Sequence, residues 1–228
     1  MKKAIMVFGP PGAGKGTQAN LLAGKFSLLH FDTGKYIEGL VYDPANQKDP
    51  LIDKLRMDFD NGLVLDPTWV YKIVKAGTQK IYDSGFGIVF SGSPRTYQEA
   101  FEAEGSGIGL IKFLETLFGK ENIHTILLQV KPETSIQRNS NRLICTVCGT
   151  AVMYHAHMRP EFCPLCGGLF KRRTLDTPET IKIRLGEYAK KTEPIINGLK
   201  KVGYEVLEID GEPLPYIVFD EVMEKLKL

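Results

Sequence analysis

The strongest indication of the fold is the segment Lys3-Ala-Ile-Met-Val-Phe8-Gly-Pro-Pro-Gly-Ala-Gly-Lys15-Gly-Thr17. A short apolar run leads directly into a glycine-rich turn, and Lys15–Lys25 continues with helix-forming residues. A strand, a tight glycine loop and a helix in this order open an α/β protein. The apolar run Ala4–Phe8 is short for a signal peptide and ends in Gly-Pro-Pro-Gly rather than at a small-residue cleavage site. We therefore interpret it as the first β-strand.

The same stretch matches a phosphate-binding loop. Gly9 and Gly14-Lys15 have the spacing G-x-x-x-x-G-K, which turns backbone N–H groups towards phosphate oxygens at a helix N-terminus. Lys15 adds a cation where the β- and γ-phosphates would lie. Ser or Thr is usual where Gly16 stands, and here the hydroxyl follows one position later. The alternative, an ordinary glycine-rich turn, is disfavoured by this context. We predict a nucleoside triphosphate site formed by Gly9, Gly12, Ala13, Gly14, Lys15, Gly16 and Thr17.

Apolar runs and helical patterns alternate along the rest of the chain. Four further runs are candidate strands, at 28–31, 86–90, 124–130 and 204–209. Between them, helical patterns begin at Asp66-Pro67, Pro132, Thr177-Pro178 and Pro213. Continuous apolar strands are typical of a parallel sheet covered on both faces. Two stretches, 33–65 and 143–173, fit the alternation poorly, and we expect them to be insertions over the strand ends, where ligands of open α/β sheets bind.

Composition excludes several classes of protein. Among 228 residues, 29 Lys and Arg oppose 27 Asp and Glu, for a net charge of +2. This balance shows no footprint for nucleic acid or an anionic membrane. Hydrophobic residues make up 43%, which suits a packed core rather than disorder. No apolar run approaches the roughly 20 residues that span a bilayer, so we expect no membrane span.

The four cysteines form two Cys-x-x-Cys pairs, Cys145/Cys148 and Cys163/Cys166. Four thiolates at this spacing suit a structural, tetrahedral Zn²⁺ with no open coordination position. The pattern is a metal site rather than a disulfide framework, so we expect a cytoplasmic protein. His155 and His157 are alternative ligands, and four unligated core cysteines are a further alternative. A segment of about thirty residues has too small a core to order itself, so a metal would supply folding energy.

Taken in order, these motifs resemble those of adenylate kinases, whose phosphate loop reads G-x-P-G-x-G-K-G-T. Asp32-Thr33-Gly34 resembles the family's Ser-Thr-Gly, and Ser91-Gly-Ser-Pro-Arg95-Thr96 resembles its Asp-Gly-Phe-Pro-Arg-Thr. The segment Arg138–Arg184 resembles the family's lid and the helix after it, and Ile209-Asp210-Gly211 resembles its closing Asp-Gly turn. The likeness covers most of the chain and is weakest over Ala45–Asp60.

The resemblance implies a P-loop fold, with a five-stranded parallel sheet and helices on both faces. It divides the chain into a core (1–31, 66–142 and 174–228), a monophosphate-binding lobe (32–65) and a zinc-binding lid (143–173). The implied reaction is ATP + AMP ⇌ 2 ADP, with Mg²⁺ on the nucleotide. We expect a monomer that acts on ATP, AMP and ADP and not on nucleic acid.

The resemblance also assigns roles to arginines, which singly would be read as ordinary surface residues. It implies that Arg95 holds the acceptor phosphate and that Arg138 lies against the ATP base. Arg142, Arg173 and Arg184 would come in with the lid, so Lys15, Arg95, Arg142, Arg173 and Arg184 are the expected catalytic residues. The spacing of Arg138 and Arg142 predicts that they share one helix face. The expected monophosphate site comprises Thr33, Gly34, Glu38, Gly62, Leu63, Val64, Gly92, Arg95, Glu99, Arg173 and Arg184.

The sequence departs from the family pattern inside this expected site. Ser91 and Lys35 stand where the family has acidic residues near Mg²⁺, and Glu38 replaces a phosphate-binding arginine. Leu175 replaces one of two paired aspartates near the lid. Glu99 replaces a glutamine that reads adenine, and an ionised glutamate can only accept hydrogen bonds.

These departures leave alternative functions open. Adenine remains the first choice of acceptor base, and guanine, with two donors on one edge, is the next. The alternatives to an adenylate kinase are a kinase for another monophosphate, with GMP first, and a zinc-stapled nucleotide-binding protein with little turnover. Nucleic-acid binding through the cysteine pairs is disfavoured by the nearly neutral charge.

Overall fold

The centre of the protein is a parallel five-stranded sheet, seen in a computed structural model that describes residues 2–46, 48–102, 108–152, 161–173 and 176–227. Its strand order is β2-β3-β1-β4-β8. The strands are β1 (Ala4–Phe8), β2 (Leu29–Phe31), β3 (Ile88–Phe90), β4 (Ile123–Gln129) and β8 (Val206–Asp210). All neighbouring pairs are parallel, and Met6 of the central strand lies between Phe90 and Thr125. All five predicted strands are confirmed, with ends shifted by one or two residues.

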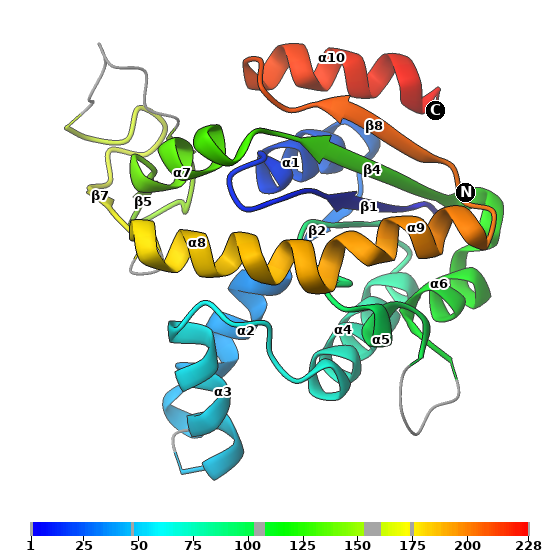
Figure 1. The fold of residues 1–228 in the computed structure, drawn as a ribbon, viewed down its shortest axis with the longest axis horizontal. Helices are drawn as coiled ribbons and strands as arrows, with labels where there is room; N and C mark the ends of the chain where they lie inside the picture. The colour runs from blue at the N-terminus through cyan, green and yellow to red at the C-terminus, as the bar shows by residue number, and fades with distance from the viewer. Residues whose placement is uncertain (1, 47, 103–107, 153–160, 174–175, 228) are drawn as a thin grey trace.

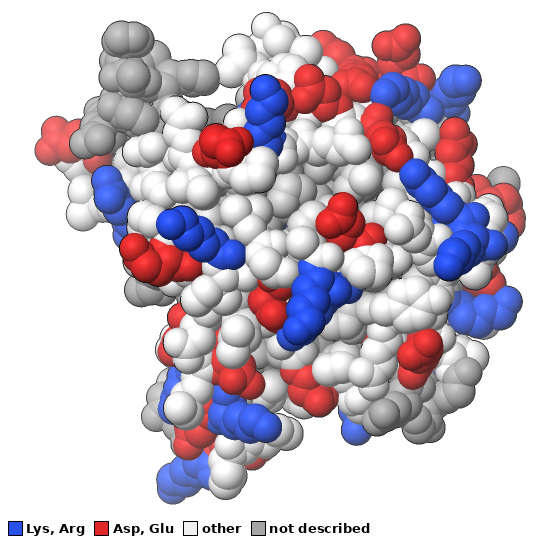
Figure 2. Space-filling view, in the orientation of Figure 1, with Lys and Arg blue, Asp and Glu red and all other residues white. Residues whose placement is uncertain are grey.

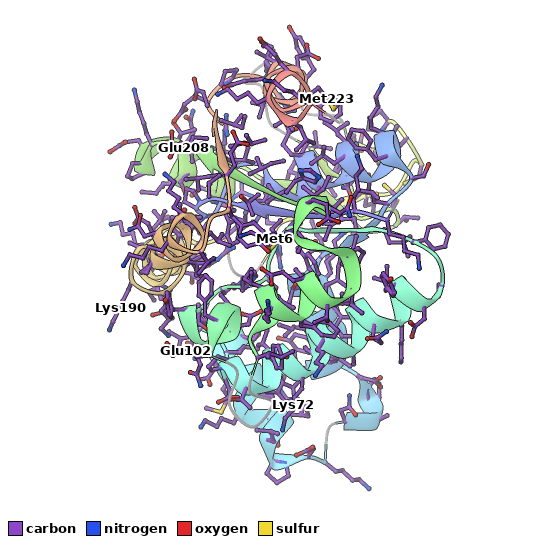
Figure 3. All side chains as sticks on the ribbon, turned by 90° about the vertical axis from the view of Figure 1, so that its right-hand side faces the viewer. Met6, Lys72, Glu102, Lys190, Glu208 and Met223 are labelled. Carbon is purple, nitrogen blue, oxygen red and sulfur yellow. The ribbon has the colours of Figure 1, made fainter. Side chains whose placement is uncertain are left out.

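Helices cover both faces of this sheet (Figure 1). Successive side chains of a strand point to opposite faces, so Ile5 and Val7 of β1 pack with one set of helices and Met6 packs with the other. Figure 3 shows Met6 in the middle of the molecule, between α10 and α4. The first face is covered by α1 (Lys15–Phe26) and α10 (Pro215–Leu226), and the second by α4 (Pro67–Asp83), α6 (Leu110–Phe118) and α9 (Glu193–Lys201).

Helix starts follow local sequence signals. At the start of α4, Asp66 Oδ1 accepts a hydrogen bond from the backbone N–H of Trp69 at 2.7 Å, and Pro67 occupies the first turn. The short helix α5 (Tyr97–Phe101) begins in the same way at Thr96, and α7 (Pro132–Ser140) begins at a proline. Sequence analysis assigned no element to 97–122 and so missed α5 and α6. The missed signal was the apolar spacing of Leu110, Leu114 and Phe118, all buried on one face of α6.

Residues 32–65, called the lobe below, form a helical hairpin. It consists of α2 (Thr33–Val41) and α3 (Pro50–Asp60), with a 3₁₀ turn at Pro44–Asn46 between them. Ile37 and Leu55 are buried in the same apolar cluster as α4. The described residues of the lobe contain no strand, and its helices project from one end of the molecule (Figure 1).

Residues 143–173, called the lid below, contain a separate small sheet in their described part. Its strands β5 (Leu143–Cys145), β6 (Ala151–Val152) and β7 (Phe170–Lys171) are antiparallel, with β5 in the middle. The lid lies at the opposite side of the molecule from the N-terminus of β1 (Figure 1). His155, His157 and Leu175 lie outside the described residues.

The long helix expected after Thr177 is interrupted. It begins as α8 (Pro178–Glu187), passes through a π-helical turn at Tyr188–Thr192 and continues as α9. Pro194 has no N–H and clashes with the carbonyl group four residues before it, so a wider turn accommodates the proline. The turn brings Tyr188 and Thr192 to the cleft described below.

No helix in the described parts of the chain combines the length and the apolar character that crossing a membrane requires. On the face shown in Figure 2, basic and acidic side chains are interspersed rather than gathered by sign.

Candidate active site

The glycine-rich loop lies at the end of the central strand, between β1 and α1. Gly9, Gly12 and Gly14 have positive φ angles of 144°, 81° and 89°, which favour glycine. Space also requires glycine, because a Cβ at Gly9 would lie 2.6 Å from the carbonyl oxygen of Leu128 and one at Gly12 would lie 2.6 Å from Asn139 Nδ2. The Ser135 hydroxyl donates to the Pro11 carbonyl, so α7 supports the loop from behind.

Lys15 lies in the loop among other cations. Its Nζ donates to the carbonyl oxygens of Gly9 at 2.8 Å and Pro10 at 2.9 Å. Burial, followed by the charges of Arg95, Arg184 and Arg142, lowers its pKa to about 7. The charged form of Lys15 is thus disfavoured, and an anion that binds in the loop would stabilise it. The loop is therefore electrostatically prepared for phosphate.

A cleft opens beside Lys15 at the carboxyl ends of β1 and β3. The loop contributes Gly9, Pro11 and Lys15, and the segment after β3 contributes Ser91, Gly92 and Arg95. The opposite wall is formed by Arg184 and Glu187 of α8 with Tyr188 and Thr192 of the π-helical turn, and by Gly62 and Val64 of the lobe. Ligands of parallel α/β sheets bind at this edge.

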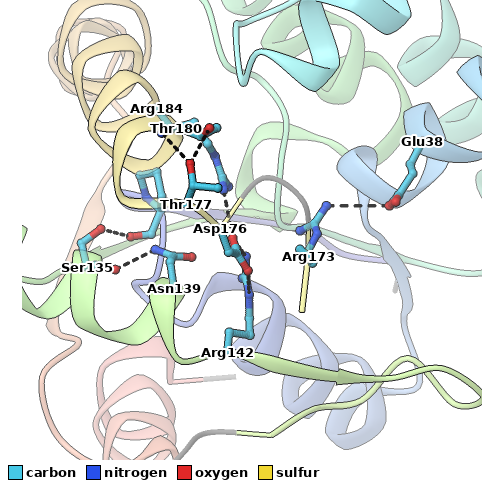
Figure 4. A network of polar contacts seen from close by, with 10 residues as sticks. Glu38, Ser135, Asn139, Arg142, Arg173, Asp176, Thr177, Thr180 and Arg184 are labelled. Atoms are coloured by element: carbon cyan, nitrogen blue, oxygen red, sulfur yellow. Dashed lines mark hydrogen bonds and ion pairs between the residues drawn. The ribbon is translucent and has the colours of Figure 1, made fainter. Parts of the chain in front are cut away.

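Two of the predicted arginines are held together by one buried carboxylate, that of Asp176 (Figure 4). Arg142 donates to both oxygens of Asp176, at 2.9 Å and 2.6 Å, and Arg184 Nη1 lies 3.5 Å from Oδ1 of the same residue. Burial, followed by the charges of Arg95 and Arg142, lowers the pKa of Arg184 to about 9. Sequence analysis did not assign Asp176 a role. A role could have been inferred, because Asp176 follows Leu175 and stands where the family has the second of its two paired aspartates.

The prediction that Arg138 and Arg142 share one helix face is wrong. α7 ends at Ser140, and the side-chain amide of Asn141 donates to the carbonyl of Gln137 at 2.9 Å. Arg142 therefore lies beyond the helix and turns to Asp176. Arg138 remains on α7 and donates to the carbonyl oxygens of Gly211 at 2.8 Å and Glu212 at 2.7 Å, next to the phosphate loop.

Arg173 and Glu38 join the lid to the lobe. Arg173 Nη2 lies 3.7 Å from Glu38 Oε2, and Glu38 is about half exposed (Figure 4). Neither residue lines the cleft, although sequence analysis placed both in the monophosphate site. The lobe's Lys35 also approaches the lid, because its Nζ lies 3.1 Å from the position that a Cβ on Gly149 would take.

A second pocket adjoins the cleft between the lobe and the core. It is lined by Thr33, Gly34, Ile37, Phe59, Leu63, Val64, Leu65, Val70, Gly92, Arg95 and Glu99. Arg95 belongs to both cavities, and its Nε donates to the Gly92 carbonyl at 2.9 Å. Of the residues that line this pocket, the sequence predicted Thr33, Gly34, Leu63, Val64, Gly92, Arg95 and Glu99 but not Ile37, Phe59, Leu65 and Val70. Apolar residues of different segments carry no local signal of a shared pocket.

Glu99 is buried at the inner end of this pocket, with 1% of its surface exposed. Its Oε2 accepts a hydrogen bond from the backbone N–H of Arg95 at 2.8 Å, whereas Oε1 has no partner. Burial raises the pKa of Glu99 to about 7, against the lowering effect of that N–H bond.

Ser91 is in contact with a histidine that sequence analysis overlooked. His30, on β2, lies with Nε2 2.7 Å from Ser91 Oγ and with Nδ1 2.6 Å from Asn20 Oδ1. The Asn20 oxygen accepts from Nδ1–H, so the Ser91 hydroxyl donates to Nε2 of the neutral ring. Burial lowers the pKa of His30, and the charge of Asp32 opposes this effect. A polar residue on an otherwise apolar strand was the available signal.

The four cysteines of the lid converge. Their sulfur atoms all lie within 4.8 Å of one another, with Cys145 and Cys166 at 3.4 Å and Cys148 and Cys163 at 3.7 Å. Metal–sulfur bonds of about 2.3 Å in a tetrahedron place sulfurs roughly 3.8 Å apart. Each pair ends in a similar turn, in which Gly149 N–H donates to the Cys145 carbonyl and Gly167 N–H to the Cys163 carbonyl. The four thiols fit a metal ion.

A phosphate loop, a cation-lined cleft and an adjoining pocket for a second molecule are the arrangement of a nucleoside monophosphate kinase, a phosphotransferase that joins two nucleotides. Comparison with known proteins agrees with this class. The adenylate kinase family model matches residues 7–204, and the chain belongs to this family.

Curated relatives match over nearly the whole chain. An adenylate kinase of Clostridium botulinum (strain Langeland) is 35% identical over 91% of this chain and 90% of its own length. One of Caldicellulosiruptor bescii is 34% identical over 92% and 93%, and one of Clostridium tetani is 33% identical over 97% of each chain. The resemblance found in the sequence motifs is confirmed.

Proposed function

We propose that this chain catalyses ATP + AMP ⇌ 2 ADP. The observation that carries the proposal is that Lys15, Arg95 and Arg184 line one cleft, with Arg142 close enough that all three arginines lower the pKa of the lysine. Phosphoryl transfer requires mainly alignment and positive charge around the moving group. The names of the curated relatives support AMP as acceptor.

Each predicted residue has a role in this proposal. The loop Gly9–Thr17 binds the donor phosphates, Arg138 lies against the donor base, and Arg95 binds the acceptor phosphate. Arg142 and Arg184, oriented by Asp176, contact the transferred group from the lid side. Arg173 would join them on leaving Glu38. An oxygen of the AMP phosphate attacks the γ-phosphorus of ATP. At the same time the bond between the γ-phosphorus and the β,γ-bridging oxygen breaks, and ADP leaves. No proton needs removal, because the acceptor is already an anion.

Mg²⁺ would be bound chiefly by the nucleotide phosphates. Within the described residues, the cysteines form the one cluster of three or more potential metal-binding side chains, so no such cluster surrounds the cleft. Ser91 offers a hydroxyl at its edge. Mg²⁺ usually retains water and phosphate ligands, and it would neutralise charge on the β- and γ-phosphates.

The lid and the lobe have distinct proposed roles. We assign Zn²⁺ to the four cysteines as a structural ion, because tetrathiolate sites of this kind leave no open position for chemistry. The lid and the lobe would close over the core and exclude water, which otherwise competes with AMP as acceptor. Four reduced cysteines also favour a cytoplasmic location.

A coupled assay of ADP formation, with ATP and each of AMP, GMP, CMP and UMP, tests the proposal. We expect AMP to be the best acceptor. We expect Lys15→Met to lower kcat by about 10²–10³-fold, because it removes a cation from the developing charge. Lys25→Met, which changes an exposed lysine of the same helix, is the matched control and should retain native turnover. A folded Lys15→Met enzyme with more than about a tenth of native turnover would contradict the assignment.

A further inference from the structure

The pocket beside Arg95 has apolar walls and two buried polar atoms without partners. Ile37, Phe59 and Val70 belong to the walls. The unpartnered atoms are Thr33 Oγ1 and Glu99 Oε1, and both residues line the pocket. A buried polar atom without a partner is destabilising until a ligand supplies the missing hydrogen bond. The pocket has a volume of about 20 Å³, so a flat heterocycle that forms hydrogen bonds along one edge would fit between these walls only as the lobe moves away from the core.

The two oxygens of Glu99 are not equivalent. Oε2 is fixed by the backbone N–H of Arg95, and the backbone N–H of Glu99 itself is bound to Thr96 Oγ1 at 3.0 Å. These bonds hold the residue at the start of α5, where the nearby Ser93 hydroxyl also favours the ionised carboxylate. Oε1 has no hydrogen-bond partner, and Oε2 keeps a second lone pair for a ligand. The position of this carboxyl group is therefore fixed, and its protonation state decides whether it can donate a hydrogen bond to a ligand or only accept one.

The neutral and ionised forms of this carboxyl match different bases. A neutral acid donates through Oε1–H and accepts through Oε2, which complements the N1 acceptor and N6 amino donor of adenine. A carboxylate accepts at both oxygens, which complements the N1–H and N2–H₂ donors of guanine. The carboxylate also repels adenine, because its oxygen and adenine N1 are both acceptors and their lone pairs would face each other.

We propose that the proton on Glu99 selects the base of the acceptor nucleotide, the neutral acid taking AMP and the carboxylate taking GMP. This inference rests on the proposed function, since it assumes that the acceptor base occupies this pocket.

Both forms of Glu99 are populated near neutral pH. Burial raises its pKa to about 7, and Arg95 is the charged group that faces it. The other side chains that line the pocket are apolar, apart from the Thr33 hydroxyl. Glu99 is therefore mainly neutral below pH 7 and mainly ionised above it, so the use of AMP falls and the use of GMP rises as the pH increases.

The test measures kcat/KM for AMP and for GMP between pH 6 and pH 8, with ATP saturating. Over this range the neutral fraction falls about tenfold and the ionised fraction rises about tenfold, so the AMP-to-GMP ratio should fall about a hundredfold. The ratio cancels the ionisation of the nucleotide phosphate, which is common to both substrates. Glu99→Gln keeps one donor and one acceptor at every pH, so its ratio should be flat and favour AMP. Glu102→Gln, at the exposed end of the same helix, should keep the native profile.

The outcomes separate this inference from the proposed function. If no monophosphate yields ADP, the proposed function fails. If AMP is converted but the native ratio does not change with pH, the kinase assignment remains and the role of the Glu99 proton is refuted. The native profile alone decides this, even if Glu99→Gln does not fold. If the AMP-to-GMP ratio of the native protein and that of folded Glu99→Gln change with pH in the same way, the role of the Glu99 proton is refuted as well.

Discussion

At the scale of single residues, Ser91 shows how a neighbour changes the meaning of a substitution. The family resemblance places a carboxylate here, and the chain instead has a hydroxyl that donates to His30. His30 is held from its other nitrogen by Asn20. The serine oxygen therefore keeps its lone pairs for a ligand, but it carries no charge to attract Mg²⁺ or its water shell.

We expect Ser91→Asp to lower the Mg²⁺ concentration at half-maximal rate. A unit charge about 4 Å from a cation contributes roughly 1 kcal/mol even in water, which is about a fivefold change. A magnesium titration of ADP formation measures the effect. Ser91→Asn introduces a side chain of nearly the same shape as Asp but without the charge. It is the matched control and should leave the Mg²⁺ requirement unchanged. An equal or higher Mg²⁺ requirement for Ser91→Asp would mean that another group, with Asp32 the first candidate, already fills the role.

At the scale of elements, the lid depends on contacts that its own small sheet cannot supply. β5, β6 and β7 have two or three residues each, and Val147, Phe162, Leu165 and Leu169 are exposed. Cys145 and Cys163 are buried. The sulfur of Cys145 contacts that of Cys166, and the sulfur of Cys163 contacts that of Cys148. A metal bound by the four thiolates would therefore hold the lid together.

We expect one tightly bound zinc per chain by elemental analysis, and a loss of roughly 5 °C or more in Tm on chelation. The physical reason is that metal binding and lid folding are coupled. Cys163→Ser should lower Tm similarly and make the protein insensitive to the chelator, which is the control for non-specific effects. Native protein without metal, and with all four thiols freely reactive, would refute this prediction.

At the scale of the whole molecule, the lid and the lobe meet through opposite charges. Arg173 of the lid pairs with Glu38 of the lobe, although the resemblance places a phosphate-binding arginine where Glu38 stands. An exposed pair of this kind contributes at most about 1 kcal/mol. Its interest is functional, because Glu38 neutralises one of the cations that we assign to the acceptor phosphate.

We expect Glu38→Gln to lower KM for AMP about threefold at low salt, because it frees Arg173 and removes an anion from the phosphate site. The gain should shrink as salt screens exposed charges. Asp53→Asn removes the same charge from α3, where Asp53 pairs with Arg56, and should leave KM unchanged. A rise in KM for Glu38→Gln would show instead that the pair positions Arg173 for the acceptor.

Features that are encoded over a few neighbouring residues could be predicted from the amino-acid sequence. Glycines with positive φ mark the phosphate loop, apolar runs mark the five strands, and Asp66-Pro67 marks the start of α4. The cysteine spacing indicated a metal cluster, and the sulfur atoms do converge. These signals are readable because backbone conformation and strand pattern depend mainly on adjacent residues.

Contacts between side chains that are distant in the sequence became visible only in the folded chain. Arg142 leaves α7 to pair with Asp176, thirty-four positions later in the chain, and His30 reaches Ser91 across the β2–β3 pair. The pocket around Glu99 combines the lobe, α4 and α5, and its burial changes which protonation state the carboxyl adopts. Such contacts depend on the order of the strands and on the desolvation of groups from separate segments. No short stretch of sequence encodes either of these.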